Sequence, residues 1–276
     1  AVSLALAASP TINDEAGNAL TDTSATGTVE TFDVNNLAPL IATIERDTPA
    51  TSATNEDSLT WRFTFAQIDN SFSLPANAFT VSGTTGTVTR VSRFSTGFDV
   101  TVSGGDLASL DGDVTIGLAN TDFADDYGNV MDRTIPGGAE LTYTVDNTAP
   151  SGHAVAINPS PINAANQTAI GVDFTGFEAG GSLTYTVTSS GGAGSLSGGF
   201  AVPVADGSFP PQDTSVIPDG TTTLTVIHTD AVGNAAPAVT VTALKDTVVP
   251  TLAITGPSGS VSGAFTATFT FSEDIQ

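Results

Sequence analysis

The sequence predicts an all-β protein that is built from sandwich domains in tandem. Short runs rich in Thr, Val and Phe alternate polar with apolar residues, and Gly, Pro, Asn, Asp and Ser separate the runs. Such runs are typical of antiparallel strands that bury one face, and helical periodicity is hard to find. Many short strands between turns indicate β-sandwiches. Clear examples are SLTWRFTF at 58–65, SLTYTVTS at 182–189, TTLTVIHT at 222–229 and GAFTATFTF at 263–271.

The chain also repeats itself. Three joints rich in Asp and Asn end in Pro39, Pro150 and Pro250, at a spacing of roughly 100 to 111 residues, the size of an immunoglobulin-type domain. An apolar strand follows each proline: LIATIE, HAVAIN and TLAITG. The motif Asp-x-x-Gly-Asn recurs as DEAGN at 14–18, DDYGN at 125–129 and DAVGN at 230–234.

This repeat divides the chain into four segments. We expect residues 1–38 to be the C-terminal part of one Ig-like domain, and 39–149 and 150–249 to be two complete Ig-like domains. Residues 250–276 are expected to be the N-terminal strands of a further domain. The chain is therefore predicted to be a window of a longer, extended and rod-like array.

Composition excludes several classes of function. The chain has 29 acidic and 6 basic residues, with a formal net charge of −23, so nucleic acid and anionic membrane surfaces are poor partners, whereas cations are attracted. It contains no cysteine, which excludes disulfides, thiolate zinc sites and a cysteine nucleophile. No apolar run reaches about 18 residues, so no membrane insertion is predicted.

The order of these motifs resembles the tandem bacterial Ig-like repeats of giant secreted and surface adhesins. FTFSED at 269–274, an Asp-Gly turn, the Asp-x-x-Gly-Asn turn and the joint VDNTAP at 145–150 carry the resemblance. It implies an extracellular or cell-surface spacer that projects a distal binding domain for adhesion or biofilm formation. FDVNNLAP at 32–39 also resembles the calcium-binding linker of cadherins, although the acidic strand motifs that complete a cadherin site are not evident.

We expect each acidic turn to face the joint before its own domain. In an Ig-type sandwich, the loops after the second strand and before the last strand lie at the pole where the chain enters. Calcium takes six to eight oxygen ligands from carboxylates, amides and carbonyls, so these residues predict structural Ca²⁺ between domains. The candidate ligands are Asn35, Asn36, Asp69, Asp125, Asp126 and Asn129 at the first joint, Asp146, Asn147, Glu178, Asp230 and Asn234 at the second, and Asp246, Glu273 and Asp274 at the third.

Turn chemistry is the alternative interpretation, and the sequence leaves both open. Asp-x-x-Gly-Asn is also a good hairpin turn, in which Asp caps the turn while Gly and Asn adopt left-handed geometry. If calcium binds, the first joint should bind it more weakly, because Asn35 stands where the other joints have Asp146 and Asp246. Asp111 and Asp113 in LDGDV are expected to form an Asx turn at the opposite pole.

No catalytic constellation is evident, so the sequence predicts no enzyme. Trp61 is expected in the core, His228 at the core edge, and His153 has no evident acid or serine partner. The tract SSGGAGSLSGG at 189–199 is expected to be a flexible surface loop.

The favoured function is a structural spacer whose partners are the neighbouring repeats of the same parent chain. The sequence does not specify the distal ligand, which is a glycan, a surface or a protein. The alternatives are a carbohydrate- or protein-binding module, an accessory module of an exported enzyme, and an S-layer or sheath component.

Overall fold

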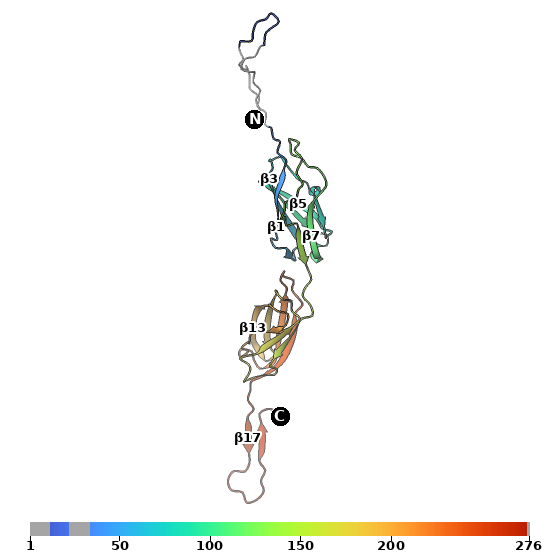
Figure 1. Cartoon of the computed structure of the whole chain (residues 1–276). Coiled ribbons are helices and arrows are strands. Elements are labelled where there is room, and N and C mark those ends of the chain that lie inside the picture. Colours follow the sequence, from blue (N-terminus) through green and yellow to red (C-terminus); the bar gives the residue numbers. More distant parts are fainter. Residues whose placement is uncertain (1–11, 22–33, 275–276) are drawn as a thin grey trace. The chain divides into compact units, whose positions relative to one another are not determined.

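The computed structural model describes residues 12–21 and 34–274, and these residues form an all-β structure (Figure 1). The predicted fold class is confirmed. Helical turns are confined, in the described ranges, to the 3-10 segments η1 (Ala76–Ala78) and η2 (Leu107–Ser109). No helix in this part of the chain has the length and apolar character needed to cross a membrane. Most of the segment 1–38 lies outside the described residues, so the predicted domain boundaries stay predictions.

The chain packs into two compact units. The first comprises Ala1–Ser52, Glu56–Leu107 and Asp113–Tyr143, and the second comprises Ala53–Asn55, Ala108–Gly112 and Thr144–Gln276.

Residues 40–146 supply two four-stranded sheets. One has the order β1 (Leu40–Thr48), β3 (Ser58–Gln67), β6 (Gly97–Ser103) and β5 (Thr87–Phe94), with antiparallel neighbours. The other has the order β2 (Ala53–Thr54), β8 (Thr142–Asp146), β7 (Asp111–Leu118) and β4 (Phe79–Ser82). In the second sheet β2 and β8 run parallel, with Ala53 opposite Thr144. We call this pair of sheets the first sandwich.

The alternation in β3 builds the core of the first sandwich. Leu59, Trp61 and Phe63 are fully buried on one face of the strand. Trp61 meets Tyr143 of β8 edge to face at 4.8 Å between ring centroids, which joins the two sheets. The prediction that Trp61 is a core residue is confirmed.

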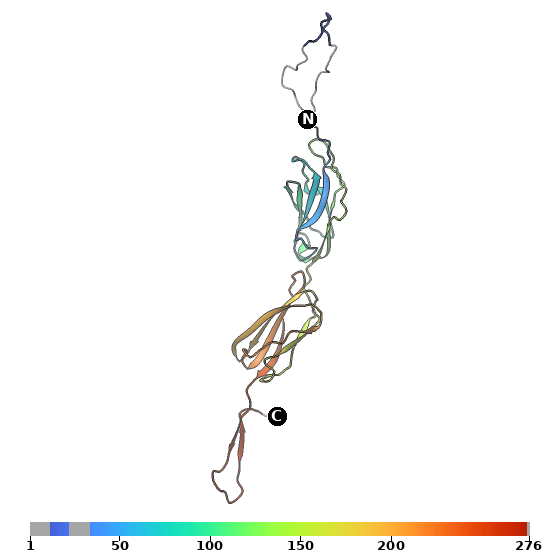
Figure 2. The same ribbon diagram turned by 60° about the vertical axis from the view of Figure 1, so that its left-hand side comes forward.

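Residues 154–246 supply two further sheets, which we call the second sandwich (Figure 2). The larger has the order β10 (Ile162–Asn163), β16 (Val239–Asp246), β15 (Gly220–Thr229), β12 (Ser182–Ser189) and β13 (Gly192–Ala201). The smaller has the order β14 (Gly207–Ser208), β11 (Gly171–Thr175) and β9 (Ala154–Asn158). Again the short strand that follows the first one is parallel to the last, because β10 pairs with β16.

The glycine-rich tract is a strand, so the loop expected at 189–199 is wrong. β13 pairs with β12 along its length, with Gly198 opposite Tyr185. A Cβ atom at Gly198 would lie 2.7 Å from the hydroxyl oxygen of Tyr185. The glycine therefore leaves room for the Tyr185 ring, which stacks on Phe200 at 5.6 Å. Cross-strand packing outweighs the low strand propensity of glycine here.

The last described segment is an antiparallel hairpin of β17 (Leu252–Thr255) and β18 (Thr268–Phe271). Large apolar side chains on it are exposed, among them Ile254 and Phe269. Within the described range this hairpin forms no core of its own, because its strands are exposed throughout.

Candidate functional site: the Asp-Asn turns and the joints

The three Asp-x-x-Gly-Asn turns share one hydrogen-bonded frame. The first and last residues of the turn are joined through their backbones, with the Asp N–H donating to the Asn carbonyl at 2.9 Å in the first turn and 3.1 Å in the other two. The glycines have positive φ angles of 88°, 84° and 109°, which favour glycine. These are Gly17, Gly128 and Gly233. The expected left-handed asparagine is wrong, because no described residue other than glycine has a positive φ.

Asp230 caps its turn with both carboxylate oxygens. Oδ1 accepts the backbone N–H groups of Val232, Gly233 and Asn234 at 2.9, 2.7 and 2.8 Å. Oδ2 accepts the side-chain amide of Asn234 at 2.8 Å. Burial raises the pKa of the Asp230 carboxyl, but the hydrogen bonds from Asn234, Gly233 and Val232 together hold it below its ordinary value.

Asp125 caps the preceding turn in the same way. Its Oδ1 accepts the backbone N–H groups of Tyr127 and Asn129 at 3.0 and 2.8 Å, and its Oδ2 accepts the Asn129 amide at 2.9 Å. Asp125, like Asp230, has only 7% of its surface exposed. We call the bond between the Asp Oδ2 and the Asn amide the brace.

Asn129 and Asn234 also reach the joint before their own sandwich. Nδ2 of Asn129 donates to the carbonyl of Asn35 at 3.0 Å, and Nδ2 of Asn234 donates to the carbonyl of Asp146 at 2.8 Å. A carboxylate oxygen and a carbonyl oxygen both accept hydrogen bonds, so only the NH₂ end of the amide can serve the two partners. Both amide hydrogens are therefore used. The turns lie against the preceding joints, as the strand order predicts.

The joints contain a turn of their own. The side-chain Oδ1 of Asn35, Asp146 and Asp246 accepts the backbone N–H of the residue two positions later, in each case at 3.0 Å. This is an Asx turn, which Asn and Asp form equally well. The backbone carbonyls of Asn35 and Asp146, rather than their side chains, accept the amides of Asn129 and Asn234.

Two aspartates outside the predicted set also hold the joints. Oδ1 of Asp111 accepts the backbone N–H of Asn147 at 2.7 Å, and Oδ2 accepts the Thr148 hydroxyl. Asp219 holds the N–H and the hydroxyl of Thr247 in the same manner, at 3.0 and 2.9 Å from Oδ2.

The prediction of a local Asx turn at Asp111 is therefore wrong, because the hydrogen-bond partners of Asp111 lie in the joint and not in its own turn. The hydrogen bonds from Thr148 and Asn147 lower the pKa of Asp111. The sequence feature that could have identified these two aspartates is an Asp-Gly pair at the start of a strand, which occurs at 111–112 and again at 219–220.

The other candidate ligands are not linked to these turns by any hydrogen bond recorded in the described ranges. Oδ1 of Asp69 caps its own loop by accepting the N–H groups of Ser71 and Phe72 at 2.6 and 3.0 Å. Oδ2 of Asp69 is buried without a hydrogen-bond partner there. The hydrogen bond from the Ser71 hydroxyl is the main cause that lowers the pKa of this carboxyl, and the charge of Arg93 adds a smaller effect. Glu273 likewise buries an oxygen without a described partner. Exposed positions are taken by Asn36, Asp126, Glu178 and Asp274.

As arranged, the turn residues do not fit a calcium ion. Hydrogen bonds from the turn occupy both oxygens of Asp125 and of Asp230. The asparagines turn their NH₂ end, not their oxygen, to the joint, whereas calcium binds oxygen atoms only. Within residues 12–21 and 34–274, no group of three or more His, Asp or Glu side chains is placed to hold a metal.

Two histidines lie side by side in the second sandwich, His228 fully buried and His153 half-buried. The rings of His153 and His228 are 5.3 Å apart between centroids, and Phe177 contacts both at 4.9 and 4.6 Å. His228 is fully buried, not at the core edge as expected. None of the four ring nitrogens has a hydrogen-bond partner in the described part of the chain. Burial, followed by the neighbouring His228, lowers the pKa of His153.

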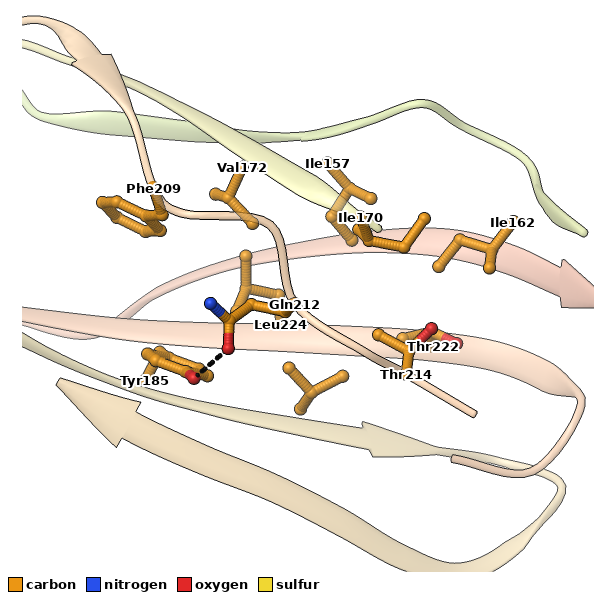
Figure 3. Close-up of a pocket in the computed structure, with 11 residues that line it drawn as sticks. Ile157, Ile162, Ile170, Val172, Tyr185, Phe209, Gln212, Thr214, Thr222 and Leu224 are labelled. Carbon is orange, nitrogen blue, oxygen red and sulfur yellow. Dashed lines mark hydrogen bonds between the residues drawn. The ribbon is translucent and has the colours of Figure 1, made fainter. Parts of the chain in front are cut away.

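A cavity in the second sandwich is a gap in the core rather than a ligand site. It lies between Ile157, Ile170 and Val172 on one side and Tyr185 and Leu224 on the other (Figure 3). Its volume of about 20 Å³ has room for about one water molecule. Gln212 accepts a hydrogen bond from the Tyr185 hydroxyl at 2.7 Å across its wall.

No protein-family model and no curated protein matches this sequence. Solved structures that align with this chain include a tetra-tandem repeat in the extending region of a large adhesion protein, at 17% identity and a TM-score of 0.36, covering 84% of this chain and 63% of that one. The D00–D0 domain of intimin aligns at 11% identity and a TM-score of 0.26, over 74% of this chain and 99% of that one. The human OSCAR ligand-binding domain aligns at 13% identity and a TM-score of 0.29, over 74% and 98%. The match thus spans less than two thirds of the adhesin structure, and these likenesses concern the fold alone.

Proposed function

We propose that this chain is a structural spacer segment of a repetitive extracellular or surface adhesin, in which sandwiches in series hold a distal binding domain away from its anchor. The observation that carries the proposal is that the same joint is built repeatedly. An Asx turn is present at Asn35, Asp146 and Asp246, and side chains from turns distant in sequence tie the joint backbone down. A chain that builds the same joint between successive sandwiches is suited to span a distance and to bear force along its length.

The strand pairing supports a load-bearing role. In each sandwich a strand near the entry joint pairs in parallel with the strand that leads to the exit joint, as β2 does with β8 and β10 with β16. Tension applied through the chain ends pulls such partners along their own axes in opposite directions. The inter-strand hydrogen bonds are then sheared together, instead of being opened one after another. A sandwich connected in this way resists extension better than one whose terminal strands peel apart.

Single-molecule stretching of the whole chain tests this role. We expect two discrete unfolding events, each releasing on the order of 300 Å, since about 100 residues span 3.3–3.6 Å each when extended. Ala53→Pro, which puts a residue without a backbone N–H into β2 of the β2–β8 pair, should lower the force of one event. Val88→Pro in edge strand β5, away from the path of force, is the matched control. Smooth extension without discrete events would count against a spacer that bears load.

A further inference from the structure

We propose that the side-chain amides of Asn129 and Asn234 fasten the joints without a bound metal ion. In this latch, the turn aspartate holds one amide hydrogen and the joint carbonyl takes the other. The biological purpose of the latch rests on the proposed spacer function. The contact itself does not, because it is present in the structure whatever the function of the chain.

The latch engages both carboxylate oxygens of Asp230 and the joint carbonyl in hydrogen bonds at the point where the turn meets the joint. The carboxylate of Asp230 accepts four hydrogen bonds, three from backbone N–H groups and one from the Asn234 amide. The joint carbonyl of Asp146 accepts the remaining amide hydrogen. A cation placed there would face the two hydrogens of an NH₂ group, which carry positive partial charge. Calcium binding would thus require the amide to flip and the brace to break.

The brace is present in a turn that contacts no joint within the described residues. In the turn at Asp14–Asn18, Oδ2 of Asp14 accepts the Asn18 amide at 2.8 Å, and Oδ1 accepts the Asn18 backbone N–H at 2.8 Å. No joint carbonyl contacts Asn18 in the described part of the chain. The aspartate therefore orients the amide within the turn alone, and the joint meets a donor that is already fixed. Preorganisation of this kind lowers the entropy lost when the joint is fastened.

The acceptor is a backbone atom, so the latch is indifferent to the side chain at the joint. Asn35 and Asp146 offer the same carbonyl at 3.0 and 2.8 Å despite their different charges. The amide contact is consequently the same at the two joints, whereas calcium coordination would favour the joint that carries the carboxylate.

Distance measurements across the second joint test the latch. The chain has no cysteine, so spin labels at Thr87→Cys on β5 and Ser195→Cys on β13, both exposed, are the only two labels. Pulsed electron paramagnetic resonance then gives the distribution of distances between them, measured on the full chain with calcium and with chelator. We expect one narrow distribution, unchanged between the two conditions.

Two substitutions separate the latch from a metal site. Asn234→Ala removes the amide, and Asn234→Asp removes it while adding a potential calcium ligand. Both variants should broaden the distribution by about twofold, as a joint freed to sample more conformations would, with and without calcium. Asn18→Asp makes the same change in the turn at Asp14–Asn18, which does not contact the second joint in the described ranges, and should leave the distribution unchanged.

Narrowing of the wild-type distribution by calcium, or its restoration by calcium in Asn234→Asp alone, would overturn the latch and establish a metal joint. Circular dichroism of each variant checks that the sandwiches remain folded. If Asn234→Asp unfolds, Asn234→Ala still decides, since an unchanged width in that variant also overturns the proposal. The stretching experiment depends on the strand pairs and not on the amides, so either proposal can fail alone.

Discussion

The joint before the first sandwich reads Asn35-Asn36-Leu37, and the joint before the second reads Asp146-Asn147-Thr148. Their charges differ, yet each forms the same Asx turn and offers a backbone carbonyl to the asparagine of a braced turn. Because the shared acceptor belongs to the main chain, the side chains of a joint are free to differ between repeats. The two joints differ in their surroundings, since Asn55 also donates to Oδ1 of Asn234 at 3.2 Å. They differ as well in the residue whose carbonyl closes the base of the turn.

Phe123 and His228 occupy equivalent places beneath the two turns. The carbonyl of Phe123 accepts the N–H of Met131 at 2.7 Å, and the carbonyl of His228 accepts the N–H of Ala236 at 2.8 Å. In the first turn the same place belongs to Ile12, whose carbonyl accepts the N–H of Leu20. Two of these residues are thus apolar and the third is a histidine, whose ring packs beside His153. The amide contact is common to the two joints, whereas the histidine pair belongs, in the described ranges, to the second sandwich.

Removal of the turn aspartate should have the largest effect and should break the similarity of the two turns. Asp230→Ala strips four hydrogen bonds from a buried carboxylate and leaves buried donors unpaired, so we expect a loss of about 3 kcal/mol in the free energy of unfolding. Asp125→Ala loses three such bonds and should cost less.

Chemical denaturation measures both losses. Asp126→Ala, at an exposed position next to Asp125, is the control and should change stability by less than about 0.5 kcal/mol. Equal and small effects in all three variants would show that the aspartates do not organise the turns.

Acidification should have a smaller effect, and it should lower the stability of the second sandwich more than that of the first. The pKa of His153 is lowered in the folded chain from an ordinary value of 6.5. The unfolded chain therefore binds more protons as the pH falls through 6.5, and the second sandwich loses stability there. The carboxylates nearest in sequence to the buried rings are Asp230, two residues beyond His228, and Glu178, beside Phe177.

Denaturation at pH 7.5 and 5.5 tests this difference. Trp61 is the only tryptophan and is buried in the first sandwich, so its fluorescence follows that sandwich while circular dichroism follows both. Between pH 7.5 and 5.5, we expect the denaturation midpoint of the first sandwich, followed by fluorescence, to move less than the midpoint of the second sandwich, followed by circular dichroism. His153→Leu, which copies Leu40 of the first sandwich, should remove the difference. Persistence of the difference in that variant would assign the pH dependence to other groups.

The sequence was sufficient for most of the strands, β13 excepted, and for the place of the turns. Alternation over 58–65 gives the buried face of β3 directly, including Trp61. The position of the Asp-x-x-Gly-Asn turns follows from strand order, since sandwich connectivity fixes which loops share a pole. Both inferences depend on local pattern and topology, which a sequence records.

The chemistry of the turns could not be predicted in the same way. An asparagine can present either its oxygen or its NH₂ group, and only the partners of Asn234 in space decide which. Asp111 and Asp219 bind joints that lie a strand or more away along the chain, so a reading of local turns assigns them the wrong partners. The glycines of β13 were misassigned because the ring of Tyr185 that fills the space above Gly198 belongs to another strand.

The most direct test of the latch is nuclear magnetic resonance of the asparagine side-chain amides in the intact chain. The account predicts that both Nδ2 hydrogens of Asn129 and of Asn234 exchange slowly with solvent and keep their chemical shifts when calcium is added. Asn18, braced but without a joint partner in the described range, serves as the internal reference. Rapid exchange of one hydrogen in Asn129 and Asn234, or displacement of these resonances by calcium, would contradict it.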